Sequence, residues 1–246
     1  MSLQPLFYKK IVPLNRERHN DLYIEPTDSF AFARQSNSLY IAAVEFPRAM
    51  AEYPIVFGTD GEGHVFPVVL LGLKSKQNLF VDKKGKWKAE YIPAYTRRYP
   101  FILAASNSNG EEQLTVCIDE GYSGFNTARE GQPLFDDKGE QSPLLKQAVD
   151  FLKDYQNQIR LTTELCDNLA QFGLLEPVQA NIEMTSGDKF AIGGFQCVSR
   201  EKLKGLAPEK LQGLVQSGRM ELIYAHLLSL YNIQSLIRKM TQEGKK

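Results

Sequence analysis

The chain is poor in cysteine, tryptophan and histidine, which narrows the chemistry it can carry. Its 246 residues include three cysteines, one tryptophan and three histidines. Cys117, Cys166 and Cys197 are odd in number and far apart, and no two of them have C-x-x-C spacing. This pattern argues against a disulfide framework and against a zinc knuckle. We therefore expect three reduced, buried thiols, no metal centre and no bound cofactor.

Neither sign of charge is in excess. Lysine and arginine total 29, and aspartate and glutamate also total 29, so we expect no nucleic-acid partner and no attraction to an anionic membrane. Long apolar runs are missing as well, because no window approaches the roughly 18 residues of a membrane span and no apolar segment follows the start of the chain. We predict a cytoplasmic protein, with surface association by a route other than Sec export left open.

What the chain does have is an internal repeat. Residues 46–57 and 92–103 share one pattern: an apolar residue before proline, five residues, a Tyr-Pro pair and three apolar residues. A second matched signal follows in each copy, with Leu-Phe-Val-Asp-Lys-Lys-Gly at 79–85 and Leu-Phe-Asp-Asp-Lys-Gly at 134–139. We interpret the middle of the chain as a duplication, approximately 44–90 and 91–142, in which each copy is a proline-bounded turn that leads into a hairpin.

After the repeat the hydrophobic period becomes helical. Ser142 is suited to cap a helix that has Pro143 at its first position, and Gly173 ends the run. Glycine- and asparagine-rich turns join the strands of three predicted hairpins, at 58–64, 106–110 and 185–188. The predicted helices and the strands of the third hairpin lie at 143–172, 178–184, 189–198, 208–216 and 219–240.

These elements predict one α+β domain over residues 1–246, with a helical and hairpin part at 143–246. An antiparallel sheet core that contains the duplicated hairpin unit is covered by the long helix and by a C-terminal helix pair. The second copy is longer than the first because of a polar, glycine-rich segment near 121–131. Loops tolerate insertions and often carry function, so this segment is a candidate; the alternative is an ordinary surface loop.

The densest cluster of aromatic and basic residues lies at 91–101. Arginine forks suit carboxylate or phosphate groups, and tyrosine rings can stack on an aromatic ligand. In the alternative interpretation the tyrosines cover the edge of the core, and the arginines are solvated or pair with Glu45, Glu52 or Glu90. Aligning the two copies also places Glu52 opposite Arg98, which would allow an ion pair. The candidate ligand-binding residues are Tyr91, Tyr95, Arg97, Arg98, Tyr99, Glu52 and Tyr53.

Other polar residues give weaker signals. Asp119 and Glu120 end an apolar strand, where carboxylates sometimes catalyse, but an acidic strand end is common. His226 is expected in the core and His64 in an exposed turn, whereas His19 has polar neighbours. The glycine-containing stretches match neither a nucleophile elbow nor a phosphate-binding loop. No catalytic residue and no metal ligand is assigned.

Three strings of the sequence resemble the SapC family of bacterial proteins. They lie at 51–57, 91–101 and 217–230, within a resemblance that runs from Val12 to Met240. The resemblance implies an association with a bacterial surface-layer locus, from which the family takes its name. A peptide-permease label sometimes given to the family conflicts with the lack of a membrane-spanning segment. The family supplies no established catalytic residues to transfer.

Two hypotheses of function follow. The first is a non-enzymatic accessory or binding protein of a bacterial surface-layer or nutrient-uptake system, with an unknown protein partner. The alternative is a small-ligand-binding protein or enzyme with a pocket between the duplicated units for an anionic or aromatic ligand, held by Arg97 or Arg98, with Glu45, Glu52 or Asp119 as acid–base groups. A DNA-binding role is disfavoured because the last helix is too apolar to read a groove.

Overall fold

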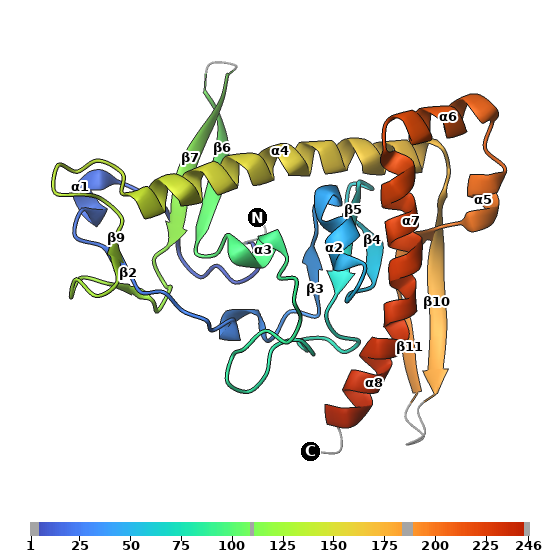
Figure 1. Cartoon of the computed structure of the whole chain (residues 1–246), viewed down its shortest axis with the longest axis horizontal. Helices are drawn as coiled ribbons and strands as arrows, with labels where there is room; N and C mark the ends of the chain where they lie inside the picture. Colours follow the sequence, from blue (N-terminus) through green and yellow to red (C-terminus); the bar gives the residue numbers. More distant parts are fainter. Residues whose placement is uncertain (1–4, 109–110, 184–188, 244–246) are drawn as a thin grey trace.

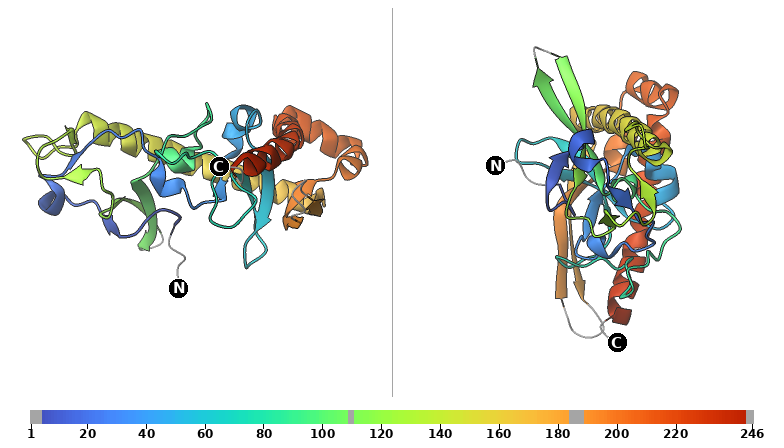
Figure 2. Two further views of the ribbon diagram at one scale, coloured as in Figure 1. Left: turned by 90° about the horizontal axis from the view of Figure 1, so that it is seen from below. Right: turned by 90° about the vertical axis from the view of Figure 1, so that its left-hand side faces the viewer.

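One long helix, α4 (Pro143–Gln171), extends along the molecule and has a separate sheet near each end (Figure 1). The computed structural model describes residues 5–108, 111–183 and 189–243. The two sheets and the helix give the molecule an elongated shape when it is viewed from below (Figure 2). The predicted α+β class is confirmed, and α4 confirms the predicted helix within one residue. Ser142 caps it, because its hydroxyl accepts the N–H of Leu145 at 3.2 Å.

A five-stranded antiparallel sheet contains the first hairpin of the repeat and the third hairpin of the chain. The two hairpins join where Gln196 of one pairs with Phe57 of the other. The predicted turn at 185–188 lies outside the described residues. In order across the sheet, the strands are β10 (Leu175–Glu183), β11 (Lys189–Val198), β4 (Ile55–Thr59), β5 (Val65–Leu70) and β3 (Ser38–Tyr40).

The second hairpin of the repeat lies in a different sheet, with the order β1-β7-β6. The sequence suggested one sheet core that contains both hairpins. In the structure the hairpins lie in different sheets, because β1 pairs with the edge of β7 and β11 pairs with the edge of β4. Part of the predicted turn at 106–110 belongs to β6, and residues 109–110 lie outside the described part of the chain. The strands are β1 (Ile11–Pro13), β6 (Phe101–Ser108) and β7 (Glu111–Asp119), and a third small sheet holds β8 (Phe125–Asn126), β2 (Tyr23–Ile24) and β9 (Gln132–Pro133).

Matched hydrogen bonds recur in the two halves of the repeat. The side chain of Asp82 accepts N–H groups two and four residues later, and Asp136 does the same in the second half. Each turn contains a glycine with positive φ, Gly85 at 84° and Gly139 at 73°, a conformation that other residues rarely adopt. These bonds are what two copies of one unit would make. The boundaries 44–90 and 91–142 and the single domain stay predictions.

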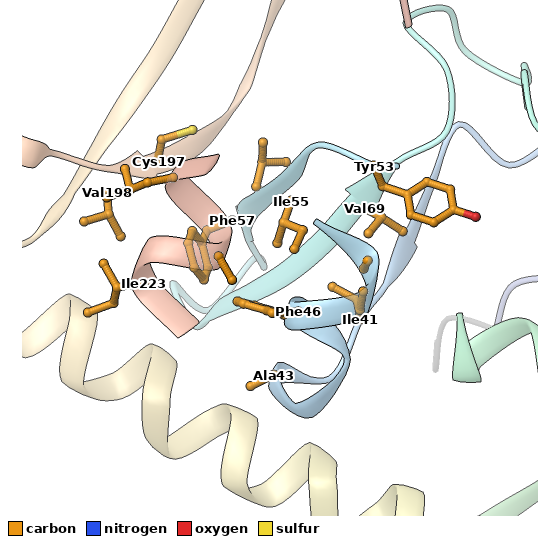
Figure 3. Close-up of a cluster of buried hydrophobic side chains, with 14 of the residues drawn as sticks. Ile41, Ala43, Phe46, Tyr53, Ile55, Phe57, Val69, Cys197, Val198 and Ile223 are labelled. Carbon is orange, nitrogen blue, oxygen red and sulfur yellow. The ribbon is translucent and has the colours of Figure 1, made fainter. Parts of the chain in front are cut away.

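The largest apolar core lies around the first hairpin. Figure 3 shows Phe46, Phe57, Val198 and Ile223 converging from α2 (Phe46–Ala49), β4, β11 and α7 (Arg219–Ser229). The second half of α4 contributes Leu165 and Leu169 to this core, whereas its first half packs Leu145 and Val149 into a separate core near β6 and β7. Burial of these side chains is the main stabilising contribution to the fold. The helix α4 therefore packs against both cores.

The C-terminal helices differ from the prediction in one place. A 3₁₀ turn, η3 (Leu230–Asn232), divides the predicted helix 219–240 into α7 and α8 (Ile233–Glu243). Ser229 Oγ donates to the carbonyl of His226 and accepts the N–H of Ile55, and such side-chain bonds compete with regular helix geometry. The remaining helices are α1 (Arg16–His19), η1 (Ala31–Ala33), η2 (Ala43–Glu45), α3 (Ala94–Arg97), α5 (Arg200–Lys204) and α6 (Pro208–Gln216).

His226 connects α7 to two strands from inside the core. Its Nε2 accepts the N–H of Val198 at 3.0 Å, and its Nδ1 lies 2.8 Å from the carbonyl of Ile55. A neutral imidazole with its proton on Nδ1 satisfies both contacts. Burial lowers the pKa of His226 to about 4. The predictions of a core histidine at 226 and an exposed one at 64 are both confirmed, as are the three buried free cysteines.

Candidate functional site

Segment 91–101 lies between the two main sheets, where α3 faces α4 (Figure 1). Three hollows border this region. The aromatic cleft, of about 500 Å³, is lined by Phe30, Phe32, Arg97, Arg98, Tyr99, Phe101, Tyr122 and Phe151 among others. The amino-terminal cleft, of about 670 Å³, includes Phe7, Lys9, Arg34, Tyr99 and Tyr122. The junction pocket, of about 310 Å³, includes Glu45, Arg48, Tyr91, Arg97, Asp154 and Tyr155.

Arg98 is a half-buried cation held by aromatic rings. Its guanidinium carbon lies 4.1 Å from the centre of the Tyr95 ring and 5.4 Å from that of Tyr155, and Tyr8 is the next ring at 5.9 Å. The Nε atom is buried without a hydrogen-bond partner. Within the described residues, no carboxylate lies at ion-pair distance from this guanidinium. Because Arg98 is half-buried and has no counterion among the described residues, its guanidinium is suited to bind an anion.

Glu52 and Tyr53 are structural rather than exposed to a ligand. The Glu52 carboxylate accepts the N–H groups of Glu90 and Tyr91, both at 2.9 Å, and the ion pair with Arg98 that the aligned copies would allow is not formed. Tyr53 is fully buried; its hydroxyl donates to the carbonyl of Tyr91 and accepts the indole N–H of Trp87. Neither residue lines the three hollows. Both fix the backbone from which the Tyr91 ring projects.

Tyr91 and Arg97 meet residues of the first unit in the junction pocket. The Tyr91 hydroxyl donates to Glu45 at 2.6 Å. The guanidinium groups of Arg48 and Arg97 lie 4.8 and 5.9 Å from the centre of the Tyr91 ring, within the range of cation–π attraction. The structure therefore brings Tyr91, Arg97 and Arg98 to neighbouring hollows, with Arg97 on the wall of both the aromatic cleft and the junction pocket.

The Tyr99 hydroxyl contacts the carboxylate of Asp119, which also accepts several backbone N–H groups. This hydroxyl donates to Asp119, which also accepts the N–H groups of Lys9, Lys10 and Gly121. Burial alone would raise the pKa of Asp119, but these hydrogen bonds outweigh it and hold the pKa below its usual value. Asp119 thus fastens the amino-terminal segment to β7. Glu120 instead forms surface ion pairs with Lys10 and Arg18, and contacts the buried ring of His19.

Several residues of the site have no signal in the local sequence. Tyr8, Phe32 and Tyr155 surround Arg98 and Tyr99, although they come from three distant segments. Besides Arg98 Nε, the hydroxyls of Thr96 and Tyr155 are buried without partners, and native structures contain few such groups. The start of the glycine-rich insertion also reaches the clefts, because Tyr122 lines both. The sequence hints at these contacts through the glycine-rich segment near 121–131 and the aromatic residues near 30–32.

The fold and the site together define an α+β protein in which arginines and tyrosines line adjoining hollows. The chain belongs to the SapC family, whose model matches residues 14–236. No curated protein and no solved structure matches the chain. The match to the family model confirms the resemblance that the sequence indicated. Within the described residues, no helix is long and apolar enough to cross a membrane, and no cluster of side chains is suited to hold a metal ion.

Proposed function

We propose that this protein binds a small organic anion in the aromatic cleft without transforming it. The single observation that carries the proposal is Arg98, a half-buried residue of the cleft lining whose guanidinium lies over the Tyr95 ring and has no anionic partner among the described residues. A carboxylate or sulfonate can satisfy a guanidinium with two parallel hydrogen bonds. Arg97 on the same wall adds a second positive charge.

The walls of the cleft favour a ligand with an apolar or aromatic body. Phe32 packs on Tyr99 with ring centres 4.4 Å apart, and Tyr99 packs on Tyr122 at 5.3 Å. Mostly apolar hollows with a few placed polar groups are typical of small-molecule sites. The candidate acid–base groups Glu45, Glu52 and Asp119 already accept backbone N–H groups, which supports binding over catalysis.

The proposal predicts saturable binding of an aromatic sulfonate. With 8-anilinonaphthalene-1-sulfonate as the probe, we expect a one-site rise in fluorescence for the wild-type protein. Arg98→Gln keeps the size of the side chain but removes its charge, and the dissociation constant should rise at least about tenfold, since a hydrogen bond to a charged group contributes about 1.5–3 kcal/mol.

Arg160→Gln is the matched control, because Arg160 is exposed on α4 and pairs with Glu164. Its dissociation constant should stay at the wild-type value, and near-ultraviolet circular dichroism should show both variants folded. Equal affinity of wild type and Arg98→Gln would overturn the proposal.

The accessory role remains a second candidate, and one surface feature favours it. Tyr224, Leu228 and Tyr231 are spaced along one face of α7 and η3 and are 48, 48 and 73% exposed. Apolar stripes of this kind often contact other proteins. If the role holds, native mass spectrometry of protein purified from its host should show a bound protein that the Leu228→Ser/Tyr231→Ser variant loses. Retention of that protein by the variant, or its absence from the wild type, would count against this role.

A further inference from the structure

The junction pocket holds two arginines on one tyrosine ring. Arg48 comes from α2 in the first unit and Arg97 from α3 in the second, and both guanidinium groups lie over Tyr91. Arg97 also lies 5.1 Å from the centre of the Phe151 ring of α4. Three separate elements therefore place two positive charges at one pocket of about 310 Å³.

The ring that supports both arginines is held firmly. Tyr91 is buried, and its hydroxyl is bound to Glu45 at 2.6 Å. Glu45 in turn accepts the N–H groups of Ala94 at 2.7 Å and Ala42 at 2.8 Å. The tyrosine platform is therefore preorganised, and the entropy lost when an anion binds is confined to the two exposed arginine side chains.

Glu45 and Asp154, the acidic residues of the pocket lining, form no ion pair with either arginine among the described residues. Both Glu45 oxygens already accept hydrogen bonds, from the N–H groups of Ala42 and Ala94 and from the hydroxyl of Tyr91. Asp154 lines the exposed side of the pocket, and in the described part of the chain neither it nor any other carboxylate forms an ion pair with Arg48 or Arg97. Arg97 donates its Nε–H to the carbonyl of Ile92 and also interacts with the Tyr91 hydroxyl, which leaves part of its fork for an anion.

We infer that the junction pocket is a second anion site, which takes a small oxyanion, a carboxylate or a phosphate group, between Arg48 and Arg97. Arginine forks bind both chemistries through charge-assisted hydrogen bonds. The site is distinct from the one that Arg98 forms in the aromatic cleft, because Arg48 lines only the junction pocket and Arg98 lines only the aromatic cleft. Arg97, on the wall between the two, belongs to both.

Thermal unfolding with inorganic phosphate or succinate tests this site. At constant ionic strength, set with chloride, ~20 mM of either anion should raise the wild-type melting temperature by about 4 °C if its dissociation constant is near ~1 mM. Arg48→Gln should lose this shift, while Arg98→Gln should keep it. A shift with phosphate alone assigns a phosphoryl group, and a shift with succinate alone assigns a carboxylate.

Two results would overturn the inference: a wild-type protein that neither anion stabilises, or equal shifts in wild type and Arg48→Gln. Arg48 is exposed, so its replacement should leave the fold intact, and the melting temperatures without added anion check this. The naphthalene-sulfonate titration of Arg98→Gln is read independently. The failure of one site therefore leaves the test of the other unaffected.

Discussion

Replacing Glu45 with alanine should lower the free energy of unfolding by about 3–5 kcal/mol, because three buried hydrogen-bond donors lose their acceptor. The Glu45 side chain is 4% exposed and joins the two units through bonds to Ala42, Tyr91 and Ala94. Its loss leaves two buried N–H groups and one hydroxyl without partners, each at a cost of about 1–3 kcal/mol. Urea unfolding followed by circular dichroism measures the change.

Two variants make the Glu45 result specific. Glu221→Ala removes an exposed carboxylate from α7 and should change stability by no more than about 0.5 kcal/mol. Tyr91→Phe removes one of the three donors and should cost about 1 kcal/mol. If Glu45→Ala loses less than Tyr91→Phe, then Glu45 does not connect the units as described.

Lowering the pH should destabilise the folded protein, because His226 is buried in its neutral form. In the unfolded chain a histidine gains its proton as the pH falls through about 6.5, whereas in the folded protein the pKa is about 4. Between these values the unfolded state binds more protons, so stability falls with pH. The slope is at most about 1.4 kcal/mol per pH unit, and about 3 kcal/mol is lost in total between pH 6.5 and pH 4.

Urea midpoints measured from pH 7.5 to pH 4 check this dependence. His226→Gln has no titrating group and should lose most of the slope in that window. His64→Gln is the control, because His64 is exposed in the β4–β5 turn beside Asp60, which raises the pKa of its imidazole. Since a raised pKa makes His64 slightly stabilising at low pH, this control should show a slope at least as steep as that of the wild type. An unchanged slope in His226→Gln would assign the acid sensitivity to other groups.

Local sequence signals predicted the elements better than their assembly. Ser142 and Pro143 marked the start of α4 correctly because capping depends on neighbouring residues. The division of the hairpins between two sheets depends on contacts such as Gln196 with Phe57, which join distant segments. The break at η3 has the same origin, since Asn232 donates to the carbonyl of Met50 and Ser229 binds Ile55.

The candidate site was predicted in part for the same reason. A dense local cluster indicated Tyr91, Arg97 and Arg98, and these residues do line the hollows. Glu52 belonged to the prediction only through the alignment of the copies, and its carboxylate binds backbone N–H groups instead. Tyr155 reaches Arg98 from α4, a contact that periodicity within one helix cannot reveal. Partners across the fold decide which polar residues remain free to bind a ligand.

The most direct test of ligand binding is native mass spectrometry on protein purified from its own host without denaturation. If a small organic anion occupies the aromatic cleft, the wild-type protein should carry a reproducible extra mass, and fragmentation should release it as an anion. The Arg98→Gln protein, purified in the same way, should lack that mass, while Arg160→Gln should retain it. A wild-type protein without added mass, or an added mass that Arg98→Gln retains, would contradict the account.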